Sequence, residues 1–359
     1  MVMDIKLIYK IFSVKTPVSK NRILYLDFIR GLLMLSVLYH HALAPLNRYI
    51  LQFHMPALFL LSGYTEGLRQ KEVPFGQYVK GKFLRLMVPY MAFELVNVPL
   101  FLAARGWLGH GPFSWKDAVV SIVTCVNNAY TGLYGRLWFL PAMFVASVLA
   151  YGIKRYLSKR HSMAIIGWSL MLFVLSYLSC RRLPCRLPFT IDTALLGAAF
   201  LLLGYVATPW LSRFFACRKI GYDIILLLLC GGVFVAANKL ADPTCYMYTN
   251  AYSDYPFMVV CALSGTALFF IVVKLLTPLM QRIPLVQEGV VWYSVHSLAV
   301  FPVHLTIKVL FIPLLERWHC QHWAVLLLLM LLLSIPLVNL ITNYCPWMLG
   351  QFPQKGKAR

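Results

Sequence analysis

Long apolar runs constrain this chain more than any other feature of its sequence. Several of them approach the ~20 residues that an α-helix needs to cross the hydrocarbon core of a bilayer. The runs cover residues 24–46, 48–67, 86–104, 137–153, 161–179, 190–209, 221–238, 255–277, 290–314 and 323–344. Only helices and closed barrels satisfy the backbone in lipid, and runs of this length favour helices. The sequence therefore predicts an all-α, polytopic integral membrane protein with about ten transmembrane helices.

The composition agrees with this fold class. Of the residues, 60% are hydrophobic and only 13% are charged, whereas soluble domains are about half apolar and about a quarter charged. We expect one membrane domain over residues 1–359, with the helical bundle at 22–345. Residues 1–21 and 345–359 are predicted to be short cytoplasmic tails.

Basic residues are distributed unevenly between the two sides of the predicted bundle. With the amino terminus in the cytoplasm, 22 of the 33 Lys and Arg residues fall in cytoplasmic segments and nine fall in outer segments. Arg30 and Lys308 fall inside runs. This positive-inside pattern predicts that both termini are cytoplasmic. We therefore explain the net charge of +21 by the membrane topology and by attraction to anionic lipid headgroups, not by a nucleic-acid partner.

The nine cysteines show no spacing typical of a zinc site, so no metal is expected. Cys180 and Cys185 flank a predicted outer loop. In an oxidising compartment they would be able to form a disulfide, and the alternative is a pair of ordinary thiols.

Four ionisable residues lie in the first run, where side chains should meet hydrocarbon: Asp27, Arg30, His40 and His41. Such groups are rare inside spans and usually functional. At 100° per residue, Arg30 and His41 share nearly one helix face, about 16 Å apart along the axis. Asp27 lies about 40° from the His41 line and His40 about 100°. The alternatives to a functional role are structural. Asp27 and Arg30 would then only form an ion pair, and His41 would only pack in the interior with a hydrogen bond.

Further polar residues fall inside other runs. His54 lies near the outer end of the second run, and His304 lies about 21 Å into the ninth, compared with about 26 Å for His41 in the first. We expect these three histidines to share a level in the outer half of the membrane. Glu66 and Glu94 are acids inside spans, each either the partner of a nearby arginine or a catalytic group.

The segment RILYLDFIRGLLMLSVLYHHA resembles the opening of membrane acyltransferases of acyltransferase family 3. Their pattern is a basic residue, an Asp five positions later, an Arg-Gly pair, and a His eleven positions after that Arg. It falls on Arg22, Asp27, Arg30, Gly31 and His41. His40 beside His41 leaves the choice of histidine open, although the helix register favours His41.

Five later segments resemble the same family, in chain order: FHMPALFLLSGY, KFLRLMVPY, LWFLPAMF, ALLGAAFLLLGY and SLAVFPVH. The first of them resembles the fucose 4-O-acetyltransferase-like branch. The matching residues include His54, Ser62, Gly63, Tyr64, Lys82, Arg85, Trp138, Gly204, Tyr205 and His304. One departure is YSVHS, where the family usually has Gly, a basic residue, Asn and Ser.

The resemblance implies an O-acyltransferase of the bacterial cytoplasmic (inner) membrane, with acetyl-CoA as donor and a cell-surface or exported glycan as acceptor. His41 would remove the proton from the acceptor hydroxyl, and His304 is a further catalytic candidate. Asp27 would hold Arg30 in place, and Ser62 would donate a hydrogen bond to the oxyanion. A covalent acyl-enzyme on His or Ser stays open as an alternative.

The binding residues are a hypothesis that we add to this resemblance. Basic side chains bind phosphates, and those expected to hold acetyl-CoA are Arg22, Arg30, Lys82 and Arg85. The residues expected to bind the acceptor are His54, Tyr64, Glu94 and Trp138. Two rival functions stay open from the sequence: a transporter or flippase of a lipid-linked glycan, and a non-catalytic membrane scaffold.

Overall fold

The fold is described by a computed structural model for residues 13, 23–69, 72–108, 115–125, 137–157 and 162–352. These residues are almost entirely helical, as predicted. Nine helices of the first two-thirds of the chain are α2 (Leu24–His41), α3 (Asn47–Gly67), α4 (Phe75–Lys82), α5 (Val88–Leu108), α6 (Trp115–Thr124), α7 (Phe139–Leu157), α8 (Ser162–Arg182), α9 (Ile191–Val206) and α10 (Thr208–Ala216). They are followed by α11 (Ile220–Leu240), α12 (Tyr255–Arg282), α13 (Pro284–Val295), α14 (Ser297–Arg317) and α15 (Trp323–Tyr344).

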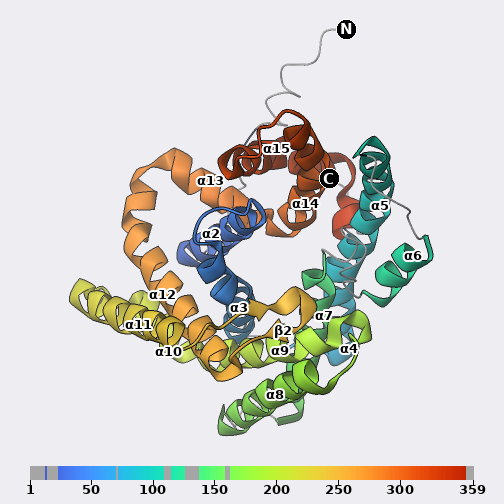
Figure 1. Ribbon diagram of the computed structural model, residues 1–359. Coiled ribbons are helices and arrows are strands. Elements are labelled where there is room, and N and C mark those ends of the chain that lie inside the picture. The colour runs from blue at the N-terminus through green and yellow to red at the C-terminus, as the bar shows by residue number, and fades with distance from the viewer. Residues whose placement is uncertain are drawn as a thin grey trace.

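Helices α2 and α3 lie near the centre of the molecule (Figure 1). Around them lie α5, α9, α12, α13, α14 and α15, and α6, α8 and α11 lie at the periphery. A small antiparallel hairpin of β1 (Cys245–Tyr246) and β2 (Ala251–Tyr252) connects α11 to α12 and pairs Cys245 with Tyr252. It crosses over α3 and α9 in the view of Figure 1.

Seven helices of the described chain are long and apolar enough to cross a membrane. They are Phe75–Leu100, Ser162–Arg182, Pro188–Val206, Ile220–Leu240, Tyr255–Arg282, Ser297–Arg317 and Trp323–Tyr344. The chain is therefore an integral membrane protein. Three more helices, α2, α3 and α7, have 18, 21 and 19 residues but carry more polar residues. The predicted count of about ten depends on them and stays a prediction, as does the cytoplasmic placement of both termini.

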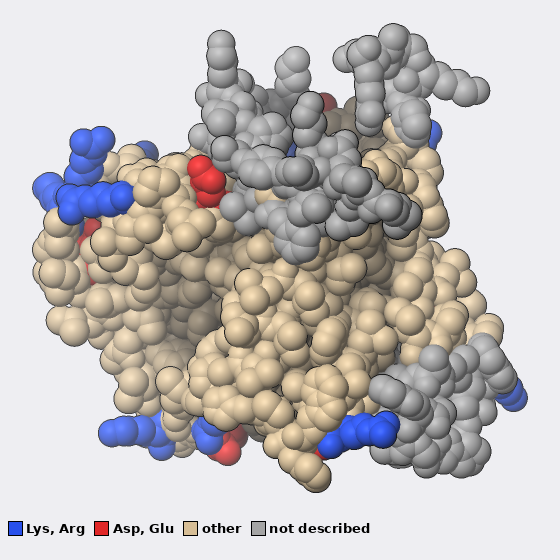
Figure 2. Space-filling view, turned by 90° about the horizontal axis from the view of Figure 1, so that it is seen from above, with Lys and Arg blue, Asp and Glu red and all other residues tan. Residues whose placement is uncertain are grey.

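The surface has the distribution that a bilayer requires. Exposed large apolar side chains cover α8 and α11, including Leu170, Val174, Ile225, Leu228 and Leu229. Figure 2 shows Lys and Arg gathered at two opposite edges of one face, with an uncharged band between them. Such a band is the expected contact surface for hydrocarbon.

Close helix crossings depend on glycine. A β-carbon at Gly63 of α3 would overlap the carbonyl oxygen of Leu201 in α9, and one at Gly204 of α9 would overlap the carbonyl oxygen of Leu60 in α3. Gly63 and Gly204, both in segments that resemble the family, thus let α3 and α9 approach closely. Gly31 has the same role between α2 and α13, where a β-carbon would overlap the carbonyl oxygen of Val290.

Two predicted boundaries differ from the structure. The ninth run, 290–314, is divided by a break at His296 into α13 and α14, because His296 leaves the helical conformation with φ −96° and ψ 10°. The predicted tail at 345–359 begins with a folded turn, η5 (Pro346–Leu349), whose Met348 and Leu349 are buried. Between the runs 86–104 and 137–153 the structure also contains α6, in which the Ile122 carbonyl accepts a hydrogen bond of 3.0 Å from the Tyr90 hydroxyl.

Candidate active site

Four histidines from three helices form one continuous cluster. The ring centroids of His41 and His304 are 4.9 Å apart, those of His40 and His41 are 5.0 Å apart, and those of His40 and His54 are 5.2 Å apart. His41, His54 and His304 therefore lie at one level of the bundle, linked through His40, and their placement in the outer half of the membrane stays a prediction. His54 and His304 are almost fully buried, and His40 and His41 are half-buried.

Hydrogen bonds fix the orientation of three of these rings. Nδ1 of His54 lies 2.8 Å from the Ile50 carbonyl oxygen, and Nδ1 of His304 lies 3.1 Å from that of Val300. Because a carbonyl only accepts, Nδ1 carries the proton in both rings, and in the neutral imidazole Nε2 then keeps its lone pair. Nε2 of His304 is buried with no hydrogen-bond partner among the described residues. His304 therefore offers an unused proton acceptor beside His41.

His40 is held differently. Its Nδ1 lies 2.6 Å from the side-chain oxygen of Asn47, the first residue of α3. This bond joins the end of α2 to the start of α3 and turns the His40 ring towards His54. His41 instead faces His304, which agrees with the separation of the two neighbours by helix register.

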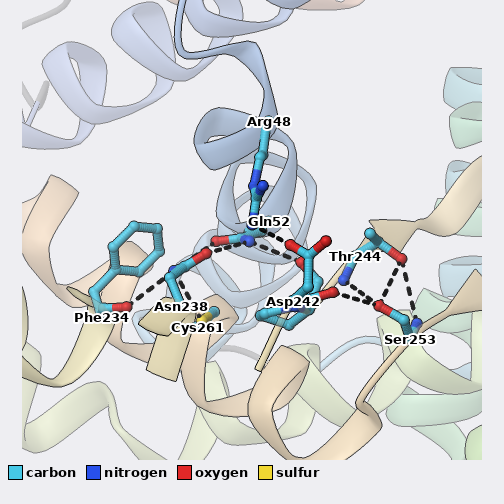
Figure 3. A network of polar contacts seen from close by, with 9 residues as sticks. Arg48, Gln52, Phe234, Asn238, Asp242, Thr244, Ser253 and Cys261 are labelled. Atoms are coloured by element: carbon cyan, nitrogen blue, oxygen red, sulfur yellow. Dashed lines mark hydrogen bonds and ion pairs between the residues drawn. The ribbon is translucent and has the colours of Figure 1, made fainter. Parts of the chain in front are cut away.

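A polar network holds the start of α3, the helix that carries His54 (Figure 3). The buried Gln52 amide donates to Asn238 of α11 and to the Pro243 carbonyl, both at 2.8 Å. Arg48 forms an ion pair with Asp242. These bonds tie α3 to the end of α11 and to the segment that leads into the hairpin. They act six and two residues before His54 and fix the helix about its axis.

Aromatic residues extend from the histidine cluster. The Phe301 ring lies 5.7 Å from His304 and 5.1 Å from Phe139, which lies 6.0 Å from Trp138. Trp138, predicted to bind the acceptor, is thus connected to His304 through two phenylalanines. Tightly packed aromatic rings of this kind exclude water from one side of a site.

Two further polar groups lie at this end of the bundle. Lys308 is one helical turn beyond His304 on the same face of α14, is buried, and interacts electrostatically with both His40 and His304. Glu94 of α5 is buried beside Tyr90 and Cys125. The sequence showed Lys308 as a charge inside a span, and this signal alone pointed to a functional role.

Basic residues gather around the other end of the Arg30–His41 face. Arg30 interacts electrostatically with Asp27 and Arg85, and Lys82 interacts with Arg85, Arg69 and Glu66. Arg69 also forms an ion pair of 3.3 Å with Glu66. Three of the four predicted donor-binding residues are therefore close enough to act together. The fourth, Arg22, lies outside the described residues.

Asp27 has a partner that the sequence did not indicate. Its Oδ1 accepts a hydrogen bond of 2.9 Å from the Ser294 hydroxyl of α13, and both side chains are buried. Ser294 belongs to the YSVHS segment that departs from the family pattern. Asp27 thus joins α2 to α13, one turn from the Gly31–Val290 contact, in addition to its interaction with Arg30.

Two predicted site residues lie away from the histidines. The Ser62 hydroxyl donates to the Leu58 carbonyl of its own helix at 2.9 Å. Tyr64 is fully buried, and its hydroxyl lies 2.7 Å from that of Tyr25, near the start of α2. Ser62 and Tyr64 are eight and ten residues beyond His54, which places them about 12 and 15 Å farther along α3.

Cysteine and metal chemistry are not suggested by the described residues. Cys180 and Cys185 are free thiols there, half-buried and exposed respectively, so the structure contains no disulfide between them. Within the described ranges, no group of three or more His, Cys, Asp or Glu side chains is arranged to hold a metal ion.

Comparison with known proteins identifies the family. A family model described as an acyltransferase domain, Acyl_transf_3, matches residues 23–342, which is most of the chain. A search of curated proteins returned no match. The matched range includes all four clustered histidines and the basic residues Arg30, Lys82 and Arg85. The chain therefore belongs to acyltransferase family 3 and is a membrane acyltransferase.

Proposed function

We propose that this acyltransferase transfers an acetyl group from cytoplasmic acetyl-CoA to a hydroxyl of a cell-surface or exported glycan, as the resemblance to the fucose 4-O-acetyltransferase-like branch suggests. The observation that carries the proposal is the arrangement along α2. One helix face has Arg30 at one end, where it interacts with Arg85 and Arg85 in turn with Lys82, and His41 beside His304 about 16 Å farther on.

The two ends suit the two halves of the donor molecule. CoA carries phosphates at one end and the thioester at the other, and Arg and Lys side chains bind phosphates through charge-assisted hydrogen bonds. In our proposal Arg30, Lys82 and Arg85 hold the phosphates on the cytoplasmic side, with Arg22. The thioester arm then extends along α2 towards His41.

In the proposed reaction His41 acts as the general base. His41 takes the proton of the acceptor hydroxyl while the hydroxyl oxygen attacks the carbonyl carbon of the thioester. When the C–S bond breaks, the CoA sulfur takes this proton back from His41. The products are the glycan ester and CoA-SH. Neutral His304, through its free Nε2, accepts a hydrogen bond and holds the reacting groups in place.

The oxyanion needs a positive or hydrogen-bonding partner. Ser62 was expected to supply it, but its hydroxyl hydrogen is used within α3. Lys308 is the better candidate, because its ammonium group lies near His40 and His304. His54, Glu94 and Trp138 are proposed to bind the acceptor at this end of the bundle.

Mass spectrometry of surface glycans tests the proposal. Cells that express the gene should carry an acetyl group that cells lacking it have lost. Purified protein should also bind acetyl-CoA saturably, which a glycan transporter would not do. Unchanged glycan masses together with no binding of acetyl-CoA would refute the proposal.

A further inference from the structure

The helix that begins at Phe75 contains a π-helical turn, η1 (Phe83–Met87), between α4 and α5. A π-turn contains one residue more than an α-turn, and such turns are rare and frequent at functional sites. The extra residue rotates the helix beyond it by about 100° relative to an unbroken α-helix. Lys82 directly precedes this turn and Arg85 lies within it. The turn therefore determines how these two cations are directed relative to the buried residues of α5.

The C-terminal end of the described chain packs against this turn. After α15 the chain forms η5 and reaches Gly350. Within this segment the Gly350 N–H donates to the Trp347 carbonyl at 2.9 Å, and the Gln351 N–H donates to the Pro346 carbonyl at 3.1 Å. Because Leu349 is also buried, residues 346–350 form a closed, anchored turn.

Gly350 makes the direct contact. Its φ of +67° lies in the left-handed region, where residues with a β-carbon are strained. A β-carbon there would also overlap the carbonyl oxygen of Leu84 and would lie 3.5 Å from the Arg85 nitrogen. The backbone of residue 350 thus lies against the backbone of the π-turn, one residue before Arg85.

We propose that residues 346–350 position the binding site for the donor phosphates. They hold η1 so that Lys82 and Arg85 converge on Arg30. The inference rests on the proposed function, because it assumes that these cations bind CoA. Its physical reason is repulsion. Arg85 repels both Arg30 and Lys82, so the three cations need a rigid scaffold to stay together before an anion binds.

The test compares two donors in the full-length protein in lipid nanodiscs. Acetyl-CoA carries phosphates, and S-acetylpantetheine presents the same thioester arm without them. The measured quantity is the ratio of kcat/KM for acetyl-CoA to kcat/KM for S-acetylpantetheine. Both values come from one preparation, so loss of folded protein cancels in the ratio. The variant is Gly350→Ala, and the control is Gly232→Ala in α11, where a β-carbon meets nothing within 4 Å.

In Gly350→Ala we expect the ratio to fall by about tenfold or more, because misdirected cations lose charge-assisted contacts with the phosphates. Leu349→Ala, which loosens the same segment without changing Gly350, should lower the ratio in the same direction, and Gly232→Ala should leave it unchanged. An unchanged ratio in both Gly350→Ala and Leu349→Ala would overturn the inference alone. A wild-type protein with no preference for acetyl-CoA would overturn the proposed function as well.

Discussion

At the scale of single residues, His304 shows how a buried group becomes available for chemistry. Its Nδ1 bond to the Val300 carbonyl fixes the proton on that nitrogen, and Nε2 is left buried without a partner among the described residues. An unmade hydrogen bond costs about 1–3 kcal/mol. A substrate hydroxyl or the protonated His41 would satisfy it, which is why we place the reacting atoms between these two rings.

A buried ion pair gives a prediction that concerns stability and not catalysis. Lys274 of α12 donates to Asp223 of α11 at 2.7 Å, and both side chains are largely buried. Removing one partner leaves an uncompensated charge, so Asp223→Leu should lower the free energy of unfolding by about 3–5 kcal/mol. Thermal unfolding in detergent measures this loss.

The double variant provides the control. Asp223→Leu combined with Lys274→Met removes both charges and should regain most of the lost stability, because paired apolar replacements are often neutral. If the double variant were as unstable as the sum of the two single variants, the pair would not be coupled.

Prediction from the sequence was uneven at this scale. The spacing of Arg30 and His41 in one helix was sufficient to place both on one face, because 3.6-residue periodicity is local information. The Ser294 partner of Asp27 could not be predicted, since it depends on how α13 crosses α2. The hydrogen bond of Ser62 within its own helix is local, but serine can also donate elsewhere.

At the scale of helices, the α3–α9 crossing depends on two glycines that face each other's backbone. Gly63→Ala and Gly204→Ala should each separate these helices, because the new methyl group would overlap a carbonyl oxygen. Overpacking of this kind destabilises by about 1–3 kcal/mol. Separation would also move His54 of α3, so acyl transfer should fall together with the melting temperature.

The matched control is Gly167→Ala in α8, where a β-carbon meets nothing within 4 Å. Alanine has the higher helix propensity, by about 1 kcal/mol, so this variant should be as stable as wild type or more so. Equal destabilisation by all three substitutions would show that close packing at the crossing is not the cause.

The helices themselves were largely predictable, because long apolar runs in a membrane protein have few alternatives. The break at His296, the π-turn at Phe83–Met87 and the folded turn at Pro346–Leu349 were not. Each of these depends on contacts between segments far apart in the chain. A glycine is needed at position 350, for example, because a β-carbon there would overlap the Leu84 carbonyl oxygen. Leu84 lies more than 250 residues earlier in the chain.

For the molecule as a whole, transfer from a cytoplasmic donor requires a fixed orientation in the membrane. The excess of Lys and Arg on one side predicts that Cys217 is cytoplasmic and that the exposed Cys185 and Cys320 face outward. In single-cysteine variants on whole cells, a membrane-impermeant maleimide at pH 8 should label Cys185 and Cys320. Cys217 should be labelled only after permeabilisation. Labelling of Cys217 in intact cells would reverse the orientation.

Cys245 of the hairpin serves as an internal control for the labelling. Burial next to Cys261 raises the pKa of Cys245 to about 12. The thiolate is the reactive form, so this thiol stays protonated at pH 8 and should not react even after permeabilisation. Its reactivity should rise only as the pH approaches the raised pKa. Rapid labelling at pH 8 would mean that the Cys245 thiol is not buried.

The central claim is that acetyl passes from CoA to an acceptor hydroxyl at His41. The most direct measurement supplies purified protein with ¹³C-acetyl-labelled acetyl-CoA and with surface glycans from cells that lack the gene, and follows the labelled ester by mass spectrometry. We expect transfer by wild type and His40→Ala, and a loss of about 10²-fold or more in folded His41→Ala. Wild-type rates in His41→Ala, or activity in His41→Ala with none in His40→Ala, would contradict the account.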